Sequence, residues 1–275
     1  MKSQRWVWKR ILAVIFVASL AGCSLFAAPK QQPSGIIGSL TAECDQGKYA
    51  SCFSLGTKYM SGSGVGKDQA LAAKLYQRAC DNHDAQGCSG LGFMYETGSG
   101  VVQDTARAVT LYRRACDGGD GKGCVMLGAM FESGERITKD QASALTLYQQ
   151  ACDRGNSMGC AELGRMYFYG NGVPKDKGRA VVLYQRACDG GDARGCANLG
   201  AAYGVGNGVA KDEARAATLF QRACDGNDVE ACGILGSIYE TGAGVAKDKA
   251  RALASYQKAC KNGLKQACND ASRLQ

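Results

Sequence analysis

The chain has 275 residues, enough for one large domain or two of ordinary size. Apolar residues make up 45% of it and charged residues 21%, which excludes a disordered or low-complexity protein. The chain has one histidine, His83, and 15 cysteines. Metal sites that need several histidines are therefore excluded. His83 falls in a predicted turn, where we expect a solvated loop residue.

Residues 1–22 have the layout of a secretory signal. Four basic residues and no acidic one precede an apolar run over 11–20, which is too short to span a bilayer and remain there. The run ends in Leu20-Ala21-Gly22-Cys23, which resembles the lipobox of bacterial lipoproteins. The resemblance implies cleavage before Cys23 and acylation of Cys23, and Ser24 in place of aspartate implies the outer membrane. A plain signal peptide with a chance cysteine is the alternative.

Residues 23–38 combine the lipidated cysteine with prolines, glutamines and small residues, which indicates a flexible tether. The folded part then covers residues 39–275. Loss of residues 1–22 leaves 29 basic and 25 acidic residues, and a balance of +4 is too small for a nucleic-acid-binding protein. We therefore expect no nucleic-acid partner and contact with a membrane only through the lipid anchor.

The other fourteen cysteines form pairs with seven residues between the partners, and each pair begins 36 residues after the previous one. A fixed period of this length indicates a solenoid of repeats. The pairs are Cys44/Cys52, Cys80/Cys88, Cys116/Cys124, Cys152/Cys160, Cys188/Cys196, Cys224/Cys232 and Cys260/Cys268.

Other residues recur with the same period. Leucine, glycine and an aromatic residue follow the second cysteine at three, four and seven residues, as in Leu55, Gly56 and Tyr59. This spacing places them on one face of a first helix. A glycine-rich turn follows, and then an aspartate such as Asp68, which is well placed to cap a second helix that ends at Cys80.

The combined pattern, L-G-x-x-Y-x-x-G-x-G-V-x-K-D-x-x-x-A-x-x-L-Y, resembles the Sel1-like repeat, a relative of the tetratricopeptide repeat. The resemblance covers roughly residues 40–275 as six full repeats with half a repeat at each end. The added cysteines resemble the Helicobacter cysteine-rich protein branch. The implied fold is an all-α, right-handed α/α solenoid of 36-residue helix-turn-helix repeats. A leucine replaces the tryptophan of many such repeats, and the turn at 134–137 departs from the pattern, but neither changes this prediction.

We interpret the paired cysteines as disulfides that staple the end of one second helix to the start of the next first helix. Two residues eight apart in one helix lie about 12 Å from each other, whereas a disulfide needs Cα atoms about 5–6 Å apart. The chain must therefore reverse between partners, and turns such as 117–120 allow it. Zinc is the alternative, but structural zinc sites have shorter cysteine spacings. Disulfides in an exported chain indicate an oxidising compartment.

The face of each first helix that is opposite the cysteine is the candidate binding surface. In solenoids of this family it lines the concave side, and in the middle repeats here it is apolar and rich in methionine, which suits a groove for apolar partners. For Met94, Met130 and Met166, packing into the core is an equally good interpretation. The predicted partner-binding residues are Phe93, Met94, Met126, Met130, Glu162, Arg165, Met166, Tyr169 and Asn198.

An enzymatic hypothesis comes from the same resemblance, because members of the Helicobacter branch bind penicillins and have been assigned weak β-lactamase activity. The chain has one Ser-x-x-Lys, with Ser255 as candidate nucleophile and Lys258 as its partner. Serine β-lactamases place that serine at a helix start and also need S-D-N and K-T-G elements. Ser255 falls inside a predicted helix and neither element follows, so chance is the favoured explanation and no catalytic residue is predicted.

We expect a monomeric, exported and lipid-anchored scaffold that binds an envelope protein or peptide, without a cofactor or a metal. The expected location is the cell envelope, as an outer-membrane lipoprotein that faces the periplasm or the surface. The alternative is a β-lactam-binding protein or weak β-lactamase, and a binder of cell-wall glycan is a third interpretation.

Overall fold

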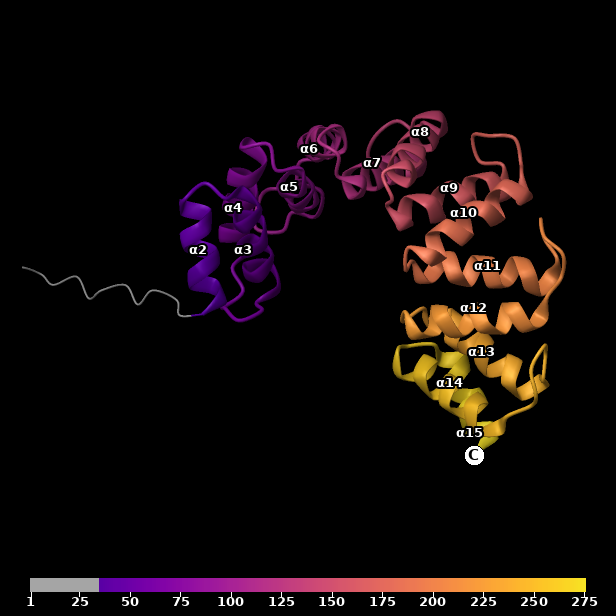
Figure 1. Ribbon diagram of the computed structural model, residues 1–275. Coiled ribbons are helices and arrows are strands. Elements are labelled where there is room, and N and C mark those ends of the chain that lie inside the picture. Colours follow the sequence, from indigo (N-terminus) through magenta and orange to yellow (C-terminus); the bar gives the residue numbers. More distant parts are fainter. Residues whose placement is uncertain (1–34) are drawn as a thin grey trace, which may run out of the picture. The chain divides into compact units, whose positions relative to one another are not determined.

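A computed structural model describes residues 35–275, and all regular structure in that part of the chain is helical. Residues 40–275 form one compact unit in which each helix from residue 49 onward packs against the helix that follows it in the chain (Figure 1). The first described helix, α2 (Ile36–Asp45), begins inside the segment 23–38 that was predicted to be a tether.

Twelve helices of equal length form six helix pairs, as the 36-residue period predicts. The first helices of the pairs are α3 (Tyr49–Ser61), α5 (Ala85–Thr97), α7 (Gly121–Ser133), α9 (Ser157–Tyr169), α11 (Ala193–Val205) and α13 (Val229–Thr241). The second helices are α4 (Gln69–Asp81), α6 (Thr105–Asp117), α8 (Gln141–Asp153), α10 (Lys177–Asp189), α12 (Glu213–Asp225) and α14 (Lys249–Lys261). A last short helix, α15 (Lys265–Leu274), follows them. The fold is the predicted all-α solenoid of helical repeats.

Local sequence sets both ends of the helices. Every second helix begins after an aspartate whose carboxylate accepts a backbone N–H of the first turn, as Asp176 does from Arg179 at 2.8 Å. Asp140 accepts from the Ser143 hydroxyl and from two backbone N–H groups, which lowers the pKa of its carboxyl. The first helices end at a glycine in the left-handed conformation, such as Gly170 with φ 83°. The repeated aspartates therefore cap helices, as their spacing predicts.

Glycines let neighbouring helices approach closely. A Cβ added at Gly159 of α9 would lie 2.5 Å from the Ala151 Cβ of α8, and one added at Gly164 would lie 2.8 Å from the Tyr184 ring of α10. The first contact recurs at Gly87, Gly123 and Gly195, whereas α3 and α13 have Ser51 and Ala231 at this position. Tyrosine rings of the second helices lie against glycines of the first helices in every repeat except that of α11 and α12, where Gly200 faces Phe220. Tyr112, Tyr148 and Tyr184 are among the largest fully buried side chains.

The structure contains the seven predicted disulfides. Each joins the end of a second helix, or of α2, to the next helix across a short turn. His83 lies in one of these turns, exposed and with φ 66°. The staples therefore connect consecutive repeats. The bonded pairs are Cys44–Cys52, Cys80–Cys88, Cys116–Cys124, Cys152–Cys160, Cys188–Cys196, Cys224–Cys232 and Cys260–Cys268.

The geometry of these bridges differs from the prediction in one respect. The Cα–Cα distances are 4.4–4.7 Å, shorter than the 5–6 Å that was expected, because the turn brings the two helix ends close together. The second cysteine of each pair is the fourth residue of its helix and lies in the first turn, as a staple to the start of that helix requires. This is the place of Cys52 in α3, Cys88 in α5, Cys196 in α11 and Cys232 in α13.

These second cysteines belong to the core and not to an accessible site. Cys52, Cys88, Cys196 and Cys232 are 0%, 1%, 3% and 1% exposed. Each of their Sγ atoms lies 3.6–3.7 Å from the carbonyl oxygen of the cysteine to which it is bonded. A disulfide sulfur carries no hydrogen, so this approach is a packing contact and not a thiol hydrogen bond. The four residues therefore act in stability and contribute nothing to a binding surface.

Cys23 and the predicted signal peptide lie outside the described residues, so their assignment stays a prediction. Within residues 35–275, none of the helices combines the length and the hydropathy that a membrane crossing requires.

Candidate partner-binding groove

The starting point for the site is a pair of residues that recurs between the two helices of a repeat. In three repeats a buried tyrosine of the second helix donates its hydroxyl hydrogen to a glutamate near the end of the first helix. Burial and the nearby carboxylate raise the pKa of these tyrosines, that of Tyr256 to about 12. The pairs are Tyr112–Glu96 at 2.6 Å, Tyr148–Glu132 at 3.1 Å and Tyr256–Glu240 at 3.0 Å.

This pairing is interrupted in the two repeats between them. Phe168 and Gly204 stand where these three repeats have glutamate, and Phe220 stands where they have tyrosine. Tyr184 remains, but within the described part of the chain its hydroxyl has no hydrogen-bond partner, although the residue is only 2% exposed. The interruption replaces a polar contact by apolar surface.

A cavity of about 420 Å³ lies at this interruption, between α9, α10, α11, α12 and α13. We call it the apolar cavity. The rings of Phe168, Tyr184 and Phe220 line it, and Ala201, Ala202 and Ala216 leave the space open. Its rim includes three of the few large apolar side chains that are exposed in the described chain: Tyr169 (63%), Val205 (68%) and Ile234 (43%).

A second hollow of about 370 Å³ continues from the apolar cavity, because both are lined by Asn198, Ala201, Phe220 and Ile234. We call it the polar hollow, since its other wall carries charged residues, and we call the two together the α9–α13 groove. The charged residues of the polar hollow are Glu162, Arg165, Arg194, Asp228 and Glu230.

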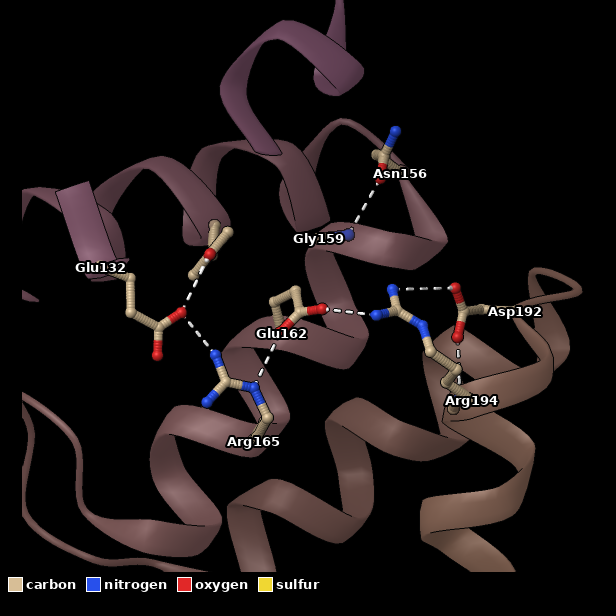
Figure 2. Close-up of polar contacts among 9 residues, drawn as sticks. Glu132, Asn156, Gly159, Glu162, Arg165, Asp192 and Arg194 are labelled. Atoms are coloured by element: carbon tan, nitrogen blue, oxygen red, sulfur yellow. Dashed lines mark hydrogen bonds and ion pairs between the residues drawn. The ribbon is translucent and has the colours of Figure 1, made fainter. Parts of the chain in front are cut away.

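A chain of ion pairs borders the groove (Figure 2). Arg165 donates to Glu132 of the preceding repeat and, at 2.8 Å, to Glu162. Arg194 of the next repeat donates to the other oxygen of Glu162 at 2.9 Å and lies 4.0 Å from Asp192. The chain thus links α7, α9 and α11, and it holds the carboxylates and guanidinium groups in fixed positions.

Burial works against the charge of Arg165, but its hydrogen bonds to Glu132 and Glu162 outweigh that penalty and raise its pKa. Burial raises the pKa of Tyr148, and the carboxylate of Glu132 adds to this effect. These groups keep one protonation state over the ordinary pH range. Arg165 is therefore a permanent positive charge at the border of the groove.

The structure brings together four of the nine residues that were predicted to bind a partner. Tyr169 lines the apolar cavity, Asn198 lines both parts of the groove, and Glu162 and Arg165 line the polar hollow. Asn198 is partly exposed, and its amide makes no hydrogen bond within residues 35–275.

Two predicted methionines do not line a groove. Met94 and Met166 are completely buried, so for these two residues the core interpretation is correct. Met94 belongs to a buried cluster with Ala72, Ala73 and Tyr76 of α4. Met130 is 7% exposed and lines, together with Met126, a hollow outside the α9–α13 groove.

The remaining two predicted residues lie in other repeats. Met126 lines a separate hollow of about 300 Å³ together with Glu96 and Arg136. Phe93 is 42% exposed on α5. Neither belongs to the α9–α13 groove.

Ser255 and Lys258 are both engaged with the backbone. Ser255 is 9% exposed and donates its hydroxyl hydrogen to the Arg251 carbonyl at 2.8 Å. Lys258 donates to the Cys224 carbonyl at 2.6 Å, at the end of the preceding second helix. One repeat earlier, Arg222 makes the equivalent hydrogen bond to the Cys188 carbonyl at 2.9 Å. Lys258 thus belongs to a column that satisfies helix C-terminal carbonyls.

Sequence reasoning missed the aromatic wall of the cavity. No role was predicted for Phe168, Tyr184 or Phe220, although a signal was present in the sequence. A column that carries glutamate in three repeats changes to Phe168 and Gly204 in the two adjacent ones.

Among residues 35–275, no group of three histidine, cysteine, aspartate or glutamate side chains is placed to hold a metal ion.

Comparisons with known proteins agree with this architecture. The model of the Sel1 repeat matches residues 50–84, 85–120, 121–156, 157–192, 193–228 and 229–264. A search of curated proteins found no match.

Several solved structures are similar to the chain. A Sel1 repeat protein from Oxalobacter formigenes is 32% identical, with a TM-score of 0.73 over 82% of this chain and 99% of that one. A protective antigen of uropathogenic Escherichia coli is 31% identical, with a TM-score of 0.68 over 86% of this chain, which spans 50% of the antigen's length. Cysteine rich protein B of Helicobacter pylori is 30% identical, with a TM-score of 0.41 over 50% of this chain and 99% of that one.

Proposed function

The chain belongs to the Sel1 repeat family, and we propose that it is an exported scaffold that binds a partner protein or peptide in the α9–α13 groove. One observation carries this proposal. Tyr169, Val205 and Ile234 expose apolar surface around a cavity of about 420 Å³, beside a fixed charged rim. An apolar centre with a polar border is the usual anatomy of a protein interface.

Two further observations support export. Seven disulfides persist only in an oxidising compartment outside the cytosol. The Escherichia coli relative is described as a protective antigen. We propose the cell envelope as the location of this chain and the outer membrane as the site of its anchor.

Val205→Glu is expected to weaken capture of the partner at least about tenfold, because it places a charge on the apolar rim of the cavity that the partner must cover. Val205 is 68% exposed, so the fold should tolerate the change. Val182→Glu is the matched control, since Val182 is 61% exposed on α10 and does not line the cavity. The measurement is quantitative capture of envelope proteins by the oxidised chain and by both variants. Equal capture by all three would place the binding surface elsewhere.

We propose that Cys23 carries the lipid anchor. Cys23→Ser is then expected to abolish incorporation of labelled palmitate and to release the protein from the membrane fraction, because the acyl chains are the only membrane attachment proposed. Ser24→Ala is the control and should keep both the label and the membrane attachment. A labelled Cys23→Ser variant would show that another residue is acylated.

A further inference from the structure

The hydroxyl of Tyr184 is a hydrogen-bond donor that opens into the apolar cavity. It belongs to a side chain that is 2% exposed, and it has no hydrogen-bond partner within the described chain. No buried side-chain oxygen of the described residues lacks a partner, so this hydroxyl is accessible from the cavity. Its equivalents in three other repeats each donate to a glutamate at 2.6–3.1 Å. A ligand that fills the cavity covers the hydroxyl, and leaving its hydrogen bond unmade is then costly. The cavity therefore suits a ligand that supplies an acceptor.

The walls of the cavity show what kind of group would carry that acceptor. Phe168, Phe220 and Tyr169 join Tyr184 to give four aromatic rings around the space, and aromatic rings pack favourably edge to face with another ring. Glu213 is the only charged residue of the lining, and it is neutralised by Lys211 at 2.6 Å. The walls are thus aromatic and balanced in charge, which favours a neutral aromatic ligand.

We propose that the apolar cavity is a specificity pocket for a tyrosine side chain of the partner. The phenol oxygen accepts a hydrogen bond from the Tyr184 hydroxyl, and the ring packs between Phe168 and Phe220. This inference rests on the proposed function, because it names the group that the partner would insert into the groove.

Other side chains fit the cavity less well. A phenylalanine or leucine would exclude water from the Tyr184 hydroxyl without replacing its hydrogen bond. A carboxylate would have to enter an apolar space that lies close to Glu162 and Glu213. Burial raises the pKa of Tyr184, with Tyr169 adding to the effect and Arg165 opposing it, so its hydroxyl stays protonated and able to donate.

The test uses the side chains of tyrosine and phenylalanine as free probes. The oxidised chain is titrated with p-cresol and with toluene, and binding is followed by NMR, first for the native sequence and then for Tyr184→Phe. The quantity of interest is the preference for p-cresol over toluene in the native chain, divided by the same preference in the variant. The difference in hydration between the probes cancels in this quotient. We expect a value of about 3–10, which corresponds to one net hydrogen bond.

Phe168→Glu provides a second variant. It restores the glutamate of the neighbouring repeats, which can accept from Tyr184 as Glu132 accepts from Tyr148. We expect p-cresol binding to weaken at least about threefold in this variant while the fold is retained. Three results would overturn the inference. They are a quotient near one, NMR chemical-shift changes at residues outside the cavity, and tighter binding of benzoate than of p-cresol.

The two proposals fail in different ways. If Val205→Glu blocks capture of the partner while the quotient is near one, the groove binds and the tyrosine specificity is wrong. If the quotient is as expected but Val205→Glu leaves capture unchanged, the cavity has the proposed chemistry and the partner binds elsewhere, which overturns the proposed function.

Discussion

Replacing Cys152 and Cys160 together by alanine is expected to lower the free energy of unfolding by about 2.5 kcal/mol, as the chain-entropy model gives for so short a loop. The two residues are 0% and 3% exposed at the junction of α8 and α9, so the lost sulfur contacts add to this effect. The measurement is urea denaturation of the native chain and of the double variant under non-reducing conditions.

The terminal pair provides the matched control for this experiment. Cys260 and Cys268 join α14 to α15 and are less buried than the central pair. Because each repeat contacts mainly its neighbours, loss of the terminal bridge should loosen α15 and change the global transition less. Equal effects of the two double variants would show that the bridges do not act locally. Peptide mapping that linked Cys124 to Cys152 would contradict the pairing itself.

Gly159→Ala is expected to destabilise the chain by about 2–3 kcal/mol, although alanine is the better helix former by about 1 kcal/mol. The added Cβ would lie 2.5 Å from the Ala151 Cβ and 3.0 Å from the Cys152 nitrogen. These atoms belong to the adjoining helix and cannot move without separating α8 from α9. Urea denaturation again gives the free energy of unfolding.

Gly178→Ala is the control, since its added Cβ would meet only the Asp176 carboxylate, at 3.5 Å. This substitution in the first turn of α10 should be neutral or should stabilise the chain by up to about 1 kcal/mol. If both alanine variants shifted stability in the same direction, close approach of the helices could not be the reason for the glycine at 159.

The scaffold could be predicted from the sequence because every feature of it recurs. The cysteine pairs, the capping aspartates such as Asp176 and the glycine-tyrosine contacts each appear in register, and a periodic signal identifies which residues share a face. The helix pairs and the disulfide partners therefore agree with the prediction. The start of α2 at Ile36 was missed because it lies before the first period.

The groove could be predicted only in part, because its decisive residues break the period. Tyr169 and Asn198 were found from their place on the first helices. Met94 and Met166 were misassigned because the depth of a side chain at the edge of a helical stripe depends on how closely the next helix packs. The cavity depends on Phe168 of α9. The effect of Phe168 can be recognised only when the fold places it beside Tyr184 of α10.

The short span of the disulfides has a consequence for how this chain matures. Each bridge closes a ring between two cysteines eight residues apart, and the seven rings follow one another along the chain without overlapping. The correct partner of every cysteine is thus also its nearest cysteine across a tight turn. A chain that crosses a membrane from its N-terminus can be oxidised one ring at a time, with each bond formed soon after its two thiols emerge. Maturation by this route requires no reshuffling of mispaired cysteines.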